Sequence, residues 1–149
     1  MDQVGYAIAG LCAAIAAGSI VFQSFIVAPA VFSSLETDAA RSFLRTLFPR
    51  FFRLNLVVAA LACGALLAAG LSNGWSVLET WGAAATAVIA LSMFVSLSVV
   101  PTINRARDAG PEGDAAFRRL HKLTVMLTVL ALLLSIAVIV AIAGTSAGY

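Results

Sequence analysis

Residues 101–124 read PTINRARDAGPEGDAAFRRLHKLT and separate two long apolar runs of the chain. They contain five of the nine Lys and Arg residues and the single histidine, His121. Each flanking run has about the 20 apolar residues that a helix needs to cross a hydrocarbon core of about 30 Å. A polar, basic segment between two such runs is typical of the end of a transmembrane hairpin at a membrane surface.

The composition of the whole chain agrees with that interpretation. Of its 149 residues, 62% are hydrophobic and only 11% are charged, and the mean hydropathy is +1.03. Soluble domains carry about a quarter charged residues, so these values indicate an integral membrane protein. Four spans would use more than half of the chain, which predicts one membrane domain over residues 1–149 with no separate soluble domain.

The apolar runs predict an all-α fold, a four-helix transmembrane bundle of two antiparallel hairpins. The turn signal Ser72-Asn73-Gly74 makes the second and third spans antiparallel neighbours. A polar loop is expected at 102–116. The predicted spans are residues 4–31, 51–71, 76–100 and 120–143.

Between the first two spans, residues 37–48 have apolar side chains at helical spacing. This pattern predicts a short amphipathic helix in the membrane interface that ends at Pro49 and turns Arg41 and Arg45 toward anionic headgroups. The alternative is a solvated loop helix without lipid contact. Arg118 and Arg119 are further candidates for contact with lipid headgroups.

The basic residues are distributed unevenly. All nine surround the first and third connections, and the termini and second connection have none. The positive-inside rule therefore places the two basic connections in the cytoplasm and both termini outside it. Membrane lipids are the expected partners. Interspersed acidic residues and the lack of an aromatic stacking platform argue against nucleic acid as a partner.

Short motifs at the predicted cytoplasmic ends of the spans resemble a known family. The chain is similar to the four-span family that includes transmembrane protein 205 and a bacterial branch labelled a domain of unknown function. The resemblance implies a multi-pass helical bundle, in the cytoplasmic membrane for bacterial members, and it implies no reaction. The family pattern commonly has tyrosine where Phe51 or Phe52 stands and serine where Thr124 stands. The motif residues are Ala28, Pro29, Phe32, Leu47, Phe48, Pro49, Pro101, Phe117, Leu120, His121 and Thr124.

Polar residues near the cytoplasmic ends of the spans form the predicted ligand site. A side-chain amide or imidazole inside lipid needs a polar partner, so such residues should face the bundle. Asn55 is also a candidate for a hydrogen bond between helices. His121 alternatively has only a structural role and ties two helices together. The ligand-binding candidates are Gln23, Asn55, Asn104, His121 and Thr124.

The chain has no recognisable catalytic motif. All seven carboxylates lie at the ends of the predicted spans or in connections, and the Gly-rich phosphate loop, the nucleophile elbow and the HExxH motif are absent. We therefore expect a non-enzymatic protein that binds a small ligand, a lipid or a partner, with no catalytic residue, no metal site and an unknown cofactor. A soft metal held by Cys12 and Cys63 is a weaker alternative.

Two other functions stay open. One is a redox subunit that binds haem or quinone, with the haem ligated by His121 from two copies of the chain. The other is an oligomeric transport module. In that case the copies would associate through Gly10, Ala14 and Gly18, which share one helix face and would let helices approach closely in lipid.

Overall fold

A computed structural model describes residues 2–146 of the chain, and nearly all of them are helical. Four helical rods, the first made of α1, η1 and α2, are long and apolar enough to cross a membrane. The predicted all-α four-helix bundle is confirmed. In chain order the elements are α1 (Asp2–Phe22), the π-helical turn η1 (Gln23–Val27), α2 (Ala28–Ser34), α3 (Thr37–Asn73), α4 (Val77–Asp108), the 3₁₀ turn η2 (Gly110–Gly113) and α5 (Asp114–Ser146).

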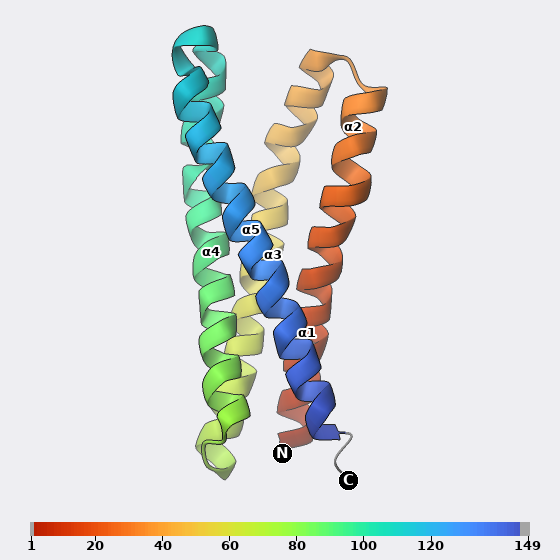
Figure 1. Cartoon of the computed structure of the whole chain (residues 1–149), viewed down its shortest axis with the longest axis vertical. Helices are drawn as coiled ribbons and strands as arrows, with labels where there is room; N and C mark the ends of the chain where they lie inside the picture. Colours follow the sequence, from red (N-terminus) through yellow and green to blue (C-terminus); the bar gives the residue numbers. More distant parts are fainter. Residues whose placement is uncertain (1, 147–149) are drawn as a thin grey trace.

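The four rods form a closed ring around the core (Figure 1). α1 packs against α3 and α5, and α4 packs against the same two helices. Within the described residues, α3 and α5 lie diagonally opposite, with no Cα atoms within 8 Å of each other. Apart from the adjoining turn η1, α2 packs only against α3. The bundle is therefore tight along most of its length and spreads apart at the end where α2 lies.

The outer surface of the bundle is apolar. At most 39% of the most apolar stretch of any rod is buried inside the chain, and large side chains such as Leu61, Leu91 and Leu133 are more than half exposed. Such a surface needs lipid around it. Trp75 and Trp81, which are 52% and 72% exposed, lie at one end of the bundle, where indole rings suit the headgroup level. The chain is a multi-pass membrane protein.

Helix α3 differs from the prediction. We expected a separate interfacial helix over residues 37–48, but these residues continue into the second span as one helix of 37 residues with Pro49 inside it. Proline removes only one backbone hydrogen bond, and helices in membranes tolerate it where other groups solvate the freed carbonyl. At about 1.5 Å per residue α3 is about 55 Å long, well beyond the roughly 30 Å hydrocarbon core. Its basic first third therefore extends past the lipid tails.

The other two mid-helix prolines are accommodated in different ways. α4 continues through Pro101 to Asp108 without a break. The first rod instead contains the π-helical turn just before Pro29, in which the Ala28 N–H donates to the carbonyl of Gln23, five residues back. A π turn inserts one extra residue and shifts the helix face.

The expected loop over residues 102–116 is also absent from the described structure. α4 ends at Asp108, the turn η2 covers Gly110–Gly113, and α5 begins at Asp114. Gly110 has a φ of 63°, which favours glycine. At Gly113 a Cβ atom would overlap the carbonyl oxygen of Ala106. Two glycines thus permit a reversal much tighter than the polar composition suggests.

A buried carboxylate closes the opposite end of the bundle. Glu79, which lies at the end of a predicted span, is only 3% exposed. It completes a capping box with Ser76 at the start of α4, and it also accepts a hydrogen bond from the Tyr6 hydroxyl of α1. The motif Ser-x-x-Glu at 76–79 is the sequence signal for this cap. These contacts of Glu79 with Tyr6 and Ser76, called the clamp below, join α1 to the start of the second hairpin.

We expect Tyr6→Phe to destabilise the bundle, because the variant removes one donor from a buried carboxylate. The expected cost is about 1–3 kcal/mol, measured as a lower unfolding midpoint of the detergent-purified protein. Thr145→Val is the matched control, since the exposed Thr145 hydroxyl only donates to the Ile142 carbonyl. An unchanged midpoint for Tyr6→Phe would show that the clamp contributes nothing.

Candidate functional site

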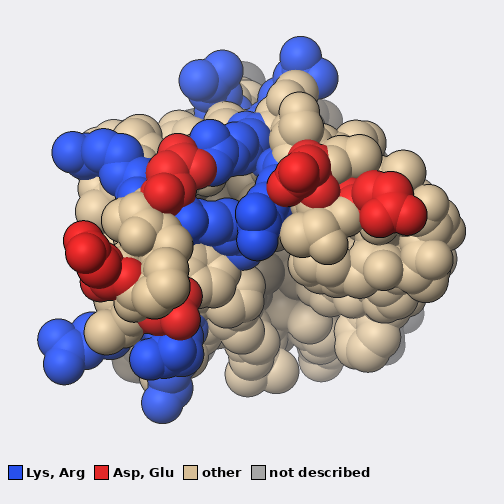
Figure 2. All heavy atoms as spheres, turned by 90° about the horizontal axis from the view of Figure 1, so that it is seen from above, with Lys and Arg blue, Asp and Glu red and all other residues tan. Residues whose placement is uncertain are grey.

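The basic end of the bundle carries a cavity. Figure 2 shows this end, with Lys and Arg side chains gathered around the hollowed middle of the face. The cavity has a volume of about 540 Å³ and is partly open to the surroundings. It lies between the α2–α3 connection on one side and the α4–α5 connection on the other. Its lining residues are Phe32, Leu35, Thr37, Ala40, Arg41, Leu44, Arg107, Gly110, Pro111, Asp114 and Phe117.

Two arginines line this cavity from opposite hairpins. Arg107, near the end of α4, is half-buried and lies 4.4 Å above the centroid of the Phe117 ring. Among residues 2–146 it has no carboxylate within ion-pair distance. Arg41 of α3 contacts Asp38 at 3.5 Å, but the two side chains are 53% and 96% exposed. Such an exposed pair contributes little free energy, so both guanidinium groups are free to bind an anion.

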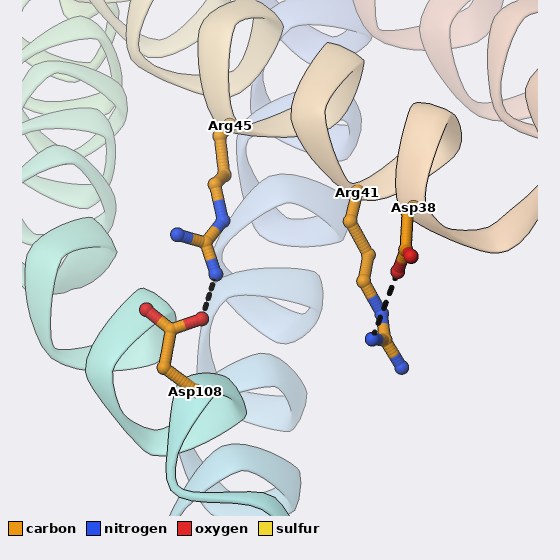
Figure 3. A network of polar contacts seen from close by, with 4 residues as sticks. All are labelled: Asp38, Arg41, Arg45 and Asp108. Carbon is orange, nitrogen blue, oxygen red and sulfur yellow. Dashed lines mark hydrogen bonds and ion pairs between the residues drawn. The ribbon is translucent and has the colours of Figure 1, made fainter.

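A partly exposed ion pair links the two hairpins beside the cavity. Arg45 of α3 donates to Asp108 at the end of α4 (Figure 3). Arg41 and Arg45 also lie near enough to Arg107 for their charges to repel it. The lining itself has two arginines and one carboxylate, Asp114, which pairs with Arg118 outside the lining. The lining therefore has a small excess of positive charge, which favours a negatively charged occupant.

His121 lies beside the cavity without lining it. Its ring is exposed and stacks on Phe117, with ring centroids 5.6 Å apart and an angle of 7° between the planes. Arg107, Phe117 and His121 therefore form one column across the α4–α5 connection. Thr124, which is buried, donates from its hydroxyl to the His121 carbonyl at 2.9 Å. This bond lies within α5 and joins no second helix.

Asn55 lies elsewhere, in the interface between α1 and α3. It is fully buried; its amide donates to the Phe51 carbonyl at 3.0 Å, and its side-chain oxygen accepts from the Ser19 hydroxyl of α1 at 3.1 Å. The predicted hydrogen bond between helices therefore exists. Gln23 is also buried, and no partner for its side chain occurs within the described residues.

The predicted polar cluster is not assembled as one site. Asn55 is on α3 and His121 is on α5, and these two helices have no Cα atoms within 8 Å of each other. Asn104 is half-buried on α4 with no side-chain hydrogen bond among residues 2–146. Of the proposed headgroup contacts, Arg41 lines the cavity and Arg45 lies beside it. Arg118 and Arg119 are exposed on α5.

The family-motif residues lie close to this basic end but have separate roles. Phe32 lines the cavity and is 68% exposed. Phe48 stacks on Phe52, with ring centroids 5.9 Å apart. Pro29 and Pro101 are exposed, whereas Pro49 and Leu120 are partly buried.

The most informative residues of the cavity, Arg107 and Phe117, were not ligand-binding candidates from sequence, although Phe117 belongs to the family motif. Their separation of ten residues has no helical periodicity, because a tight turn lies between them. The signal for their contact was the pair of glycines at 110 and 113, which permits α4 and α5 to approach directly after the turn. A cation next to an aromatic residue across such a turn can be recognised only when the turn geometry is known.

The two cysteines, Cys12 and Cys63, belong to one packed cluster of side chains between α1 and α3. Cys12 and Cys63 are both free thiols, and the Cys63 thiol donates to the Ala83 carbonyl at 3.6 Å. No cluster of three metal-binding side chains occurs among residues 2–146. Ala14 and Gly18 are exposed on the outer face of α1. The association of chains through that face stays a prediction.

Comparison with known proteins identifies one family. The family described as "Domain of unknown function (DUF4149)" matches residues 11–112. The match covers α3, α4 and most of the first rod, and it includes nine of the eleven residues that line the cavity. It agrees with the predicted resemblance at the level of a family of unknown function and gives no support to the likeness to transmembrane protein 205. No curated protein and no solved structure matches the chain.

Because Asn55 and His121 lie in different parts of the bundle, we expect their substitutions to have different effects on the free energy of unfolding. Asn55→Ala should lower the free energy of unfolding by about 1–2 kcal/mol, because it removes a buried hydrogen bond between helices and leaves Ser19 without that partner. His121→Ala should change it by less than about 0.5 kcal/mol, because the ring is exposed. Unfolding of both variants in the same detergent measures the difference. Equal losses of unfolding free energy in the two variants would contradict the conclusion that only Asn55 stabilises the packing of the helices.

Proposed function

The chain belongs to the family of the domain of unknown function DUF4149, and we propose that it binds a small organic anion at the basic end of its membrane bundle. The observation that carries this proposal is the cavity of about 540 Å³ that Arg41 and Arg107 line from opposite hairpins. Its volume lies within the roughly 300–1,000 Å³ typical of small-molecule sites.

The lining of the cavity indicates the chemical class of the ligand. Arginine binds carboxylate and phosphate oxygens through two parallel hydrogen bonds. Phe32 and Phe117 add apolar surface to the same lining. A carboxylate or phosphate ester with an aromatic or aliphatic part would use both kinds of wall. The Phe117 ring already orients Arg107, which lowers the cost of ordering that side chain on binding.

The cavity residues support binding without chemical conversion. Among its lining residues the only acidic group is Asp114, which pairs with Arg118 at 3.7 Å. The lining contains no thiol and no imidazole. We therefore propose a receptor or carrier of the anion that has no catalytic residue of its own.

The location of the cavity sets the side from which the ligand arrives. The cavity lies on the parts of α3 and α4 that extend past the hydrocarbon core, so a water-soluble ligand reaches it without crossing lipid. The positive-inside rule assigns this end to the cytoplasm and the termini to the other side of a cytoplasmic membrane. A cytoplasmic metabolite with a negative charge is the proposed ligand. Kinship with transmembrane protein 205 stays a prediction from the short motifs.

Phenyl phosphate is a suitable probe, because it combines a phosphate group with an aromatic ring. We expect saturable binding to the detergent-purified protein by isothermal titration calorimetry. Arg107→Gln should weaken it about tenfold or more, the equivalent of one charge-assisted hydrogen bond. Arg105→Gln is the matched control on the same helix, since Arg105 is exposed, contacts Thr102 at 3.2 Å and does not line the cavity.

Two results would contradict the proposed function. One is the absence of saturable binding by the wild-type protein at millimolar phenyl phosphate. The other is an equal loss of affinity in the Arg107 and Arg105 variants, which would indicate general attraction to a basic surface. Inorganic phosphate should bind more weakly than phenyl phosphate, because it lacks the ring that contacts Phe32 and Phe117.

A further inference from the structure

A second hollow lies on the outer surface of the bundle, between the first rod and α3. It has a volume of about 260 Å³ and is open on one side. It shares no lining residue with the cavity of about 540 Å³, so an occupant would be independent of the proposed anion site. The lining residues are Ser19, Phe22, Gln23, Val27, Leu47, Arg50, Phe51 and Leu54.

Gln23 is the unusual residue of this hollow. Its side chain is only 7% exposed, and within residues 2–146 its amide has no hydrogen-bond partner. Among the described residues, the fully enclosed side-chain polar atom without a partner is Ser96 Oγ, so the Gln23 amide is not fully enclosed and reaches the surface of the hollow. In lipid an amide without a partner costs free energy, because water cannot replace the partner. Gln23 also begins the π turn η1, and π turns occur often at functional sites. We therefore expect a ligand to provide the missing hydrogen-bond partner of the Gln23 amide.

The other polar groups of the hollow differ in their availability. Ser19 already donates to the Ala16 carbonyl at 3.0 Å and to Asn55 at 3.1 Å. Arg50 is exposed and has no carboxylate within ion-pair distance among the described residues. The surface of the hollow is almost entirely apolar, so Arg50 lines it mainly with the hydrocarbon part of its side chain, and its guanidinium group stays free beside the hollow. The lining of the hollow contains no carboxylate.

The hollow lies at the depth of the membrane at which the phosphate and ester groups of a phospholipid are found. If the hydrocarbon begins near Leu71, close to the exposed Trp75, about 20 residues of α3 reach its other boundary near Phe52. Arg50 then lies at the level of lipid phosphates, and the neighbouring Gln23 lies near the ester carbonyls. The open side is flanked by Phe22 and Leu54, which are 56% and 47% exposed and suit contact with an acyl chain.

We propose that this hollow binds one anionic glycerophospholipid from the leaflet at the basic end of the bundle. Arg50 would bind the phosphate, the Gln23 amide would donate to an ester carbonyl, and an acyl chain would lie along Phe22 and Leu54. The lipid is anionic because the lining has a cation and lacks a carboxylate that would bind an ammonium or choline group. No bond is made or broken.

Native mass spectrometry of the full chain tests the proposal. The protein is titrated with palmitoyl-oleoyl phosphatidylglycerol and, separately, with the phosphatidylcholine of the same chains. We expect one tightly retained phosphatidylglycerol and a preference of about tenfold over phosphatidylcholine, the equivalent of one charge-assisted contact.

Two variants separate the two contacts. Arg50→Gln should abolish the preference between the lipids, because it removes the charge that distinguishes them. Gln23→Leu should weaken both lipids several-fold and keep the preference, because both lipids have the ester carbonyls. Gln23→Leu should also fold at least as well as the wild type, since it removes an unpartnered amide. Gln23→Met is the second variant at this position.

The matched controls are Arg53→Gln and Ser24→Ala, since both residues are exposed neighbours that do not line the hollow. Equal effects of the Arg50 and Arg53 variants would overturn the proposal and indicate only a basic surface. Unchanged lipid affinity in both Gln23 variants would also overturn it. Arg107→Gln should leave lipid binding intact, so failure of the proposed anion site and failure of this lipid site are distinguishable.

Discussion

The mismatch between the length of the helices and the thickness of the membrane is the constraint on which the rest of the structure depends. α3, α4 and α5 contain 37, 32 and 33 residues, whereas about 20 residues suffice to cross the hydrocarbon. Inside lipid the backbone must satisfy its own hydrogen bonds, so the helices stay regular there. The surplus turns extend past the membrane at the basic end, where charged side chains can be hydrated.

The two ends of the bundle are stabilised in different ways. At the end with the Asn73–Ser76 turn, Glu79 joins α1 to α4 through Tyr6 and Ser76, and small residues such as Ala9 and Ala62 are fully or almost fully buried. At the basic end α2 packs only against α3, and the hairpins are joined by the Arg45–Asp108 ion pair. A bundle that is tight at one end and spread at the other leaves room for a cavity that arginines surround.

Much of the fold could be predicted from sequence, because the length of an apolar run and the cost of an unpaired backbone group in lipid decide it. The four spans, the two hairpins and the bond of Asn55 to another helix depend on such local features. The continuation of α3 past Pro49 could not be predicted, since it depends on whether water or protein replaces one lost hydrogen bond.

The cavity could not be predicted either, because it depends on contacts across a turn. Arg107 meets Phe117 only because Gly113 permits close approach to Ala106. The π turn before Pro29 has no distinctive composition, so the hollow beside Gln23 had no sequence signal beyond one polar residue in an apolar run.

The placement of the membrane along α3 is the central claim, because both proposed sites take their chemistry from it. Spin labels at the exposed positions Ser42, Thr46, Leu54 and Leu61, one at a time in liposomes, report contact with oxygen in lipid and with a nickel chelate in water by power-saturation spectroscopy. The account predicts that labels at Ser42 and Thr46 contact the chelate, that labels at Leu54 and Leu61 contact oxygen, and that the boundary lies between Thr46 and Leu54. Labels at Ser42 and Thr46 that are accessible to oxygen and protected from the chelate would place the cavity within the hydrocarbon core and contradict the account.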